Sequence, residues 1–137
     1  AFVKDWIIKV RNDVPDAPVL VTAGGLLHYF EENKVISLLR MIGQSGNMEV
    51  VFDTVNKKGM AMMQKKYMKQ VGHADAQMFF YVDAAKELAA KIRGNVKVIA
   101  EEPYYRYIPK NGLKLSTKVS MAVSDQFKMV KMIHLKL

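Results

Sequence analysis

The chain has 137 residues, a formal net charge of +8 and no cysteine. This length is enough for one domain with its own core, and we expect residues 1–137 to form a single domain. The lack of cysteine excludes disulfides, thiolate metal sites and a cysteine nucleophile, which fits a cytoplasmic protein. No apolar run approaches the roughly 20 residues that a membrane-spanning helix needs, so we expect no membrane partner.

The first predicted elements are a short helix or turn over 6–10 and a strand over 19–23. Turn-forming aspartate and proline residues separate them. The strand is apolar almost throughout, which favours burial on both faces, as in a parallel sheet covered by helices. Gly24 and Gly25 follow it and predict a compact turn at its carboxyl end, the place where open α/β sheets bind ligands.

An amphipathic helix is predicted to begin near Glu31 and to end at Gly43. Its buried stripe has helical spacing and consists of Val35, Leu38, Leu39 and Ile42. A second strand with an apolar centre is predicted over 48–54.

A long basic helix is predicted over 57–71, closed by Gly72. Its lysines are Lys57, Lys58, Lys65, Lys66 and Lys69. They raise the possibility of nucleic-acid binding, but no nucleic-acid motif accompanies them, and we favour a solvated helix face. For its methionines, Met60, Met62, Met63 and Met68, we favour core filling over a substrate-shaping wall.

The remaining chain predicts two more helices and two more strands. Residues 77–82 form a short strand or an extended approach to a helix over 84–92, for which Asp83 is the predicted N-cap and Gly94 the stop. The other predicted elements are a strand over 96–101, a tyrosine- and proline-bearing loop over 103–113, a helix over 115–123 and a strand over 129–137. Strands that alternate with helices indicate an α/β fold with a Rossmann-like sheet.

Three segments carry a resemblance to a known family. Pro18–Phe30 resembles the PVLFIAEGVLMYF segment of the tetracenomycin-type O-methyltransferases, which belong to the leucine carboxyl methyltransferase superfamily. In both, acidic residues and then a valine follow the segment; here they are two glutamates and Val35. Glu49–Asp53 resembles the next strand of that family, and Met129–Leu137 resembles its C-terminus. The resemblance covers nearly all of this chain but only the second half of the family's.

The resemblance implies a class I S-adenosylmethionine-dependent methyltransferase fold, in which the strands run 3-2-1-4-5-7-6 and strand 7 is antiparallel. This chain would supply strands 4, 5, 7 and 6 of that partial Rossmann-like sheet, with flanking helices. The N-terminal strands would be missing, and with them the glycine-rich loop and the acid that holds the ribose. We therefore expect a C-terminal fragment that is inactive alone.

The resemblance also places the expected cofactor contacts. S-adenosylmethionine would lie against Val3, Asp5, Ala23, Gly24 and Gly25. The family usually has an acid three residues before the tryptophan, where this chain has Val3, and often a glutamate where it has Gly24. Both departures remove polar anchors. The two glycines allow close approach of a cofactor, or they only form the tight turn.

Further candidates lie near the same strand ends. His28 is a candidate general base for methyl transfer to an oxygen, or a structural residue. The candidate substrate contacts are Tyr29, Asp53, Tyr104 and Tyr105. The alternative role is packing for Tyr29, a turn or cap for Asp53, and loop packing for Tyr104 and Tyr105. His134 lies in an alternating strand and is read as structural, and the scattered histidines form no metal motif.

The predicted function is thus S-adenosylmethionine-dependent O-methylation of a small molecule. The alternative is a non-catalytic, methyltransferase-derived domain that binds or interacts with a partner. The strand over 19–23 would be a sheet edge without strand 1 beside it, and it carries no proline or charge that would block pairing, so we expect a homo-oligomer joined through this edge.

Overall fold

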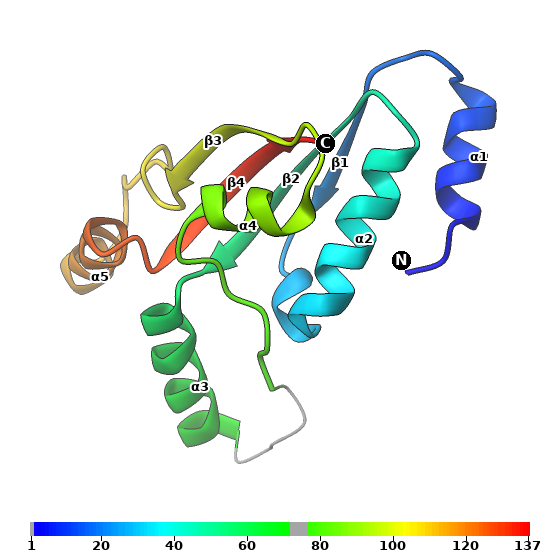
Figure 1. The fold of residues 1–137 in the computed structure, drawn as a ribbon. Helices are drawn as coiled ribbons and strands as arrows, with labels where there is room; N and C mark the ends of the chain where they lie inside the picture. Colours follow the sequence, from blue (N-terminus) through cyan, green and yellow to red (C-terminus); the bar gives the residue numbers. More distant parts are fainter. Residues whose placement is uncertain (1, 72–76) are drawn as a thin grey trace.

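In a computed structural model that describes residues 2–71 and 77–137, the chain is an α/β protein with one mixed four-stranded sheet and flanking helices (Figure 1). In chain order the elements are α1 (Asp5–Asp13), β1 (Val19–Ala23), the 3-10 turn η1 (Leu27–Tyr29), α2 (Glu32–Gln44), β2 (Met48–Val55), α3 (Lys57–Val71), α4 (Ala85–Ile92), β3 (Lys97–Pro103), α5 (Leu115–Gln126) and β4 (Val130–Lys136). The α/β class is confirmed, and the predicted helix stop at Gly72 lies outside the described residues.

The sheet has the order β1-β2-β4-β3. β1 and β2 are parallel, with Val21 opposite Val50. β4 runs antiparallel to both of its neighbours, with Ile133 opposite Phe52 on one side and Glu101 on the other. The observed order and the antiparallel last strand agree with the order expected for the four strands.

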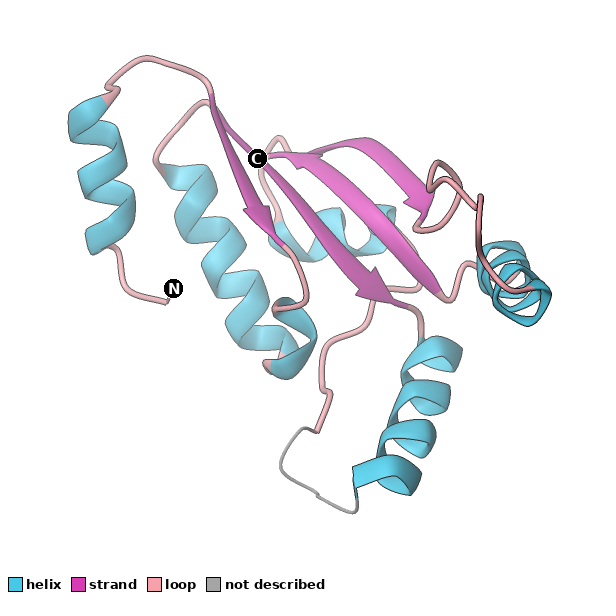
Figure 2. Cartoon of the chain, turned by 180° about the vertical axis from the view of Figure 1, so that it is seen from behind, coloured by secondary structure: helices cyan, strands magenta, loops and turns pink. Residues whose placement is uncertain are grey.

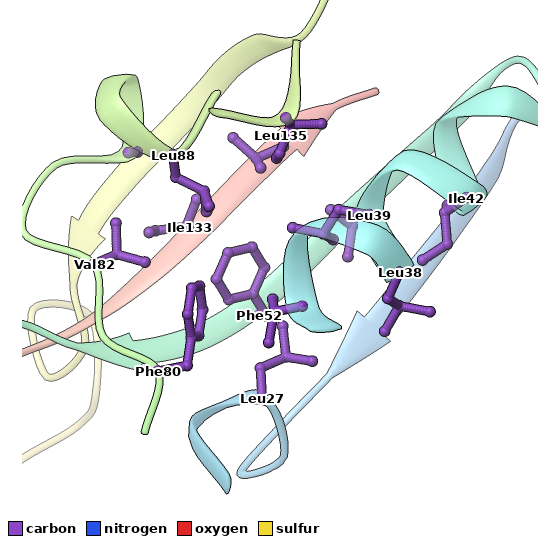
Figure 3. Close-up of a cluster of buried hydrophobic side chains, with 14 of the residues drawn as sticks. Leu27, Leu38, Leu39, Ile42, Phe52, Phe80, Val82, Leu88, Ile133 and Leu135 are labelled. Carbon is purple, nitrogen blue, oxygen red and sulfur yellow. The ribbon is translucent and has the colours of Figure 1, made fainter. Parts of the chain in front are cut away.

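The core lies between one face of this sheet and the helices α2 and α4. Phe52, Ile133 and Leu135 point from the central strands toward the helices, and each is fully buried (Figure 3). The predicted stripe of α2 packs there, since Val35, Leu38, Leu39 and Ile42 are all buried. Each such side chain contributes about 1.5–3 kcal/mol by leaving water, so this layer holds the sheet and α2 together.

The expectation that the strand over 19–23 is buried on both faces is wrong. Its residues alternate between partly buried and exposed, and Leu20 is 55% exposed. The helices α1, α2 and α4 lie on one side of the sheet, and Figure 2 shows the other side without a described helix over it. An apolar run indicates a hydrophobic strand, but it does not indicate whether one or both faces of that strand are covered.

Two predicted helix ends are also wrong. Asp83 does not cap α4, whose first N–H, that of Ala85, donates instead to Glu101 at 3.0 Å. Asp83 accepts a hydrogen bond from the N–H of Lys57 at 2.9 Å and so caps α3. Gly43 does not end α2, which continues to Gln44. A Cβ at Gly43 would lie 3.2 Å from the Cβ of Leu137, so glycine there permits close approach of the C-terminus.

The basic helix α3 fits its sequence interpretation only in part. Four of its lysines are exposed, as a solvated face requires: Lys57, Lys58, Lys65 and Lys66. Met60 is buried, as core filling predicts, but Met62 and Met63 are 58% and 41% exposed, so core filling is wrong for these two. The side chains of Met68 and Lys69 lie outside the described part of the chain.

The segment before α4 is an extended connection and contains no strand. It still contributes to the core, because Phe80 and Val82 are buried against Phe52 and Leu88 (Figure 3).

At the other end of the sheet, Arg11 connects α1 to the loops around it by donating hydrogen bonds to the carbonyl oxygens of Ala17 at 2.7 Å and Asn47 at 3.1 Å. Within the described ranges, no helix is both long and apolar enough to cross a membrane.

Candidate functional site

The turn after β1 is joined to the end of β2 by one side chain. Ala23 is paired with Phe52, which brings the next residue of β2, Asp53, beside the turn. Its Oδ1 accepts a hydrogen bond from the N–H of Gly25 at 2.7 Å. Gly25 has a φ of +62°, a conformation that glycine adopts without steric cost. Asp53 therefore has the turn role that the sequence left open beside a substrate role.

The same turn is open on its outer side. A Cβ built on Gly24 or Gly25 would meet no other atom within 4 Å. A ligand could therefore approach the backbone here as closely as glycine allows. Ala23, just before them, is partly buried against the core and anchors the turn.

His28 lies directly behind this turn, in η1. It is only 8% exposed. Burial lowers the pKa of His28 from its ordinary value of 6.5, although the negative charge of Asp53 acts to raise it. The imidazole is therefore neutral near pH 7 and has a nitrogen that can accept a proton. Its burial, however, leaves little of the ring within reach of a substrate.

The rest of η1 links this region to the segment before α4. The carbonyl oxygen of His28 accepts hydrogen bonds from the N–H groups of Phe79 at 2.8 Å and Phe80 at 3.3 Å. Tyr29 is half exposed, and its ring lies 4.3 Å from that of His28, centroid to centroid. We call the residues gathered here the carboxyl-edge cluster: Ala23, Gly24, Gly25, His28, Tyr29 and Asp53.

Val3 and Asp5 do not join the carboxyl-edge cluster through any described contact. Both are exposed; Val3 precedes α1 and Asp5 is its first residue, and α1 runs beside α2 (Figure 1). The nearest link is a ring contact of Phe2 with Phe30 at 4.7 Å, which brings the chain before α1 close to the start of α2. These two candidates therefore stand beside the cluster rather than in it.

Tyr104 and Tyr105 lie at the same edge of the sheet but on the far side of it. They follow β3, three positions from β1 in the strand order, which at the usual strand spacing is about 14 Å. Their rings contact each other edge to face at 5.1 Å. The N–H of Tyr105 donates to Asp125 at 3.1 Å, so loop packing accounts for its position. A substrate would have to span the width of the sheet to contact both groups.

Sequence reasoning missed an ion pair between a buried lysine and a part-buried glutamate next to this edge. Lys131 of β4 is 1% exposed, and its Nζ lies 2.8 Å from Glu101 Oε1 and 2.7 Å from the carbonyl oxygen of Asp83. A signal was available, because strict alternation from Ile133 and Leu135 places Lys131 on the buried face. The pair fixes the starts of α3 and α4 relative to the sheet.

No group of three or more histidine, aspartate or glutamate side chains in the described part of the chain could hold a metal ion. No protein-family model and no curated protein matches the chain.

Proposed function

We propose that this chain carries the second half of an S-adenosylmethionine-dependent O-methyltransferase fold that acts on a small molecule. The observation that supports this most is the strand order β1-β2-β4-β3 with β4 antiparallel, combined with an open glycine turn at the carboxyl end of β1. Ligands of open α/β sheets bind at such strand ends. The proposal rests on this arrangement and on the resemblance of the turn segment.

Two features of the described residues support a contact with one side of S-adenosylmethionine. A Cβ built on Gly24 or Gly25 meets nothing within 4 Å, which leaves space for a ligand to contact the backbone. The carboxylate of Asp53 already accepts the N–H of Gly25, so its engaged oxygen holds the turn. The cofactor would supply an electrophilic methyl group. A neutral His28 could take the proton from the acceptor oxygen, once the acceptor reached it.

This partial fit predicts weak binding by the chain alone and no methyl transfer. Ligand-observed saturation-transfer NMR with S-adenosylhomocysteine tests it. We expect transfer to the adenine protons with a Kd weaker than about 100 µM, or −5.5 kcal/mol. Gly24→Val should abolish the transfer, because it fills the open space without requiring a left-handed residue. Ala61→Val, at an exposed position of α3, is the matched control.

Two results would count against the proposal. Transfer that survives Gly24→Val would move the ligand away from the turn. No transfer at millimolar ligand would favour the alternative, a non-catalytic domain of the same origin. That alternative is supported by the open face of the sheet, where Leu20 is exposed.

A further inference from the structure

A second candidate site lies between α3 and α5, where β2 ends and β4 begins (Figure 1). It is an open cavity of about 370 Å³. Met62 and Met63 of α3 form one wall, and Val119 and Val123 of α5 form the other. All four of these side chains are exposed. The cavity is separate from the carboxyl-edge cluster, with which it shares no residue.

Two hydrogen bonds and one close backbone approach hold the sheet side of this cavity together. Asn56 accepts a hydrogen bond from the N–H of Gly59 at 2.7 Å, which caps α3, and donates to the carbonyl oxygen of Phe127 at 3.0 Å. A Cβ at Gly59 would lie 2.5 Å from the carbonyl oxygen of Met129, so α3 approaches β4 as closely as glycine permits. Asn56 and Gly59 thus fix both helices to the same strand end, and the cavity is part of the fold rather than a gap between loose helices.

The described lining of the cavity carries positive charge. Lys66 is the only charged side chain among the described residues that line it. Lys65 on the same helix and Lys118 on the facing one are exposed nearby in sequence. The acid of α5, Asp125, is engaged with the N–H of Tyr105. A largely apolar cavity lined by one exposed cation suits a ligand with an apolar body and an anionic head.

We propose that the cavity between α3 and α5 binds a small single-chain amphiphile with a carboxylate head, of the fatty-acid type. The tail would lie between the methionine and valine walls, and the head would pair with Lys66 at the mouth. Methionine walls adapt to flexible chains. The volume of about 370 Å³ lies toward the small end of the range for ligand pockets, which suits one short chain better than a protein helix.

The test is a titration of the protein, labelled with ¹³C at its methionine methyl groups, with octanoate and decanoate. We expect saturable shifts at Met62, Met63 and Met129, and none at Met48, which is fully buried in the main core. Decanoate should bind roughly tenfold more tightly than octanoate, because two more methylene groups leave water. This readout does not depend on any methyltransferase activity, so it can fail or succeed independently of the proposed function.

Two ligand controls and three variants test the chemistry. Decanol and decyltrimethylammonium should bind more weakly than decanoate. Lys66→Gln should weaken decanoate about threefold and leave decanol unchanged, as expected for an exposed ion pair. Lys58→Gln, an exposed lysine of the same helix that does not line the cavity, should change neither. Val119→Asp should weaken decanoate more than tenfold.

Three results would overturn the proposal. One is no saturable shift at the lining methionines. Another is equal affinity for the cationic and anionic amphiphiles, which would leave a nonspecific apolar surface. The third is a change of the same methionine signals on simple dilution without ligand, which would show that a second copy of the chain occupies the cavity.

Discussion

Asp53 Oδ1 lies 2.7 Å from the backbone nitrogen of Gly25, and this hydrogen bond fastens the turn after β1 to the end of β2. It adds a side-chain contact to the backbone pairing of Ala23 with Phe52, at the edge where the candidate site lies. The turn requires a residue with a positive φ at Gly25 and a hydrogen-bond acceptor at Asp53.

Removing the acceptor should loosen the turn. Asp53→Ala should lower the free energy of unfolding by about 1–2 kcal/mol, because a donor near the sheet edge loses its partner. Asp53→Asn keeps an acceptor oxygen and should cost less. Urea denaturation of both variants measures this. An equal loss in the two variants would contradict the role of the hydrogen bond.

The pKa of His28 should respond to the same residue. Burial holds this pKa below 6.5, and Asp53 acts against it. Asp53→Asn should therefore lower the pKa further, which a pH titration of the imidazole proton signals by NMR would show. A rise on this substitution would rule out the electrostatic coupling.

The lowered pKa of His28 also predicts a pH dependence of stability. Because His28 binds a proton more readily in the unfolded chain, the free energy of unfolding should rise with pH through the range just below 6.5.

The ion pair between buried Lys131 and part-buried Glu101 should contribute to the acid stability of the fold. Burial alone raises the pKa of Glu101, but hydrogen bonds from Lys131 and from the N–H of Ala85 outweigh it, so the pKa lies below 4.5. A depressed carboxyl pKa adds stability above the unfolded value, and this stability is lost as the pH falls through the folded one. Urea midpoints between about pH 6 and about pH 3 should fall more steeply for the native chain than for Glu101→Gln.

Breaking the same pair from one side should be costly. Glu101→Ala leaves the Lys131 ammonium buried beside a single carbonyl oxygen, that of Asp83, and should cost about 3 kcal/mol. The double variant Lys131→Met with Glu101→Gln removes both charges and should recover part of that loss. If the double variant is less stable than Glu101→Ala, the pair is not the source of the cost.

The exposed edge of β1 should support self-association. Among the described strands β1 pairs only with β2, and Leu20 is exposed on β1. Light scattering coupled to size exclusion at about 100 µM should detect a dimer. Leu20→Lys should weaken it, and it is a better probe than Val21→Lys, since Val21 packs against the core. A native chain that stays monomeric at this concentration would sink the idea.

Much of the fold could be predicted because its signals lie within single sequence segments. The stripe of α2 and the alternation of β4 each have the period of their element, so the sequence carries their type and their buried side. The burial of β1 could not be predicted, because an apolar strand looks the same whether one or two layers cover it. The prediction of the α4 cap failed for a related reason. Asp83 lies next to α4 in the sequence, but it accepts its hydrogen bond from the N–H of Lys57 in α3, 26 residues away.

The site was predictable to the extent that it is local. Gly24, Gly25 and His28 follow one another along the chain, and Asp53 joins them because parallel strands end at the same edge. Tyr104 and Tyr105 end on that edge too, but no pattern within a strand reveals how far apart two strands lie in the sheet. The cavity between α3 and α5 was hidden because Met62 and Met63 look like core residues in the sequence.

We propose that the turn after β1 forms half of a cofactor site, and amide chemical-shift mapping with S-adenosylhomocysteine is the direct test. We expect small, saturable shifts confined to Ala23, Gly24, Gly25 and Asp53, and their loss in Gly24→Val. Shifts that centre elsewhere, or none at millimolar ligand, would contradict it. A Kd in the low micromolar range, about −8 kcal/mol, would contradict the claim that these residues form only half of the site.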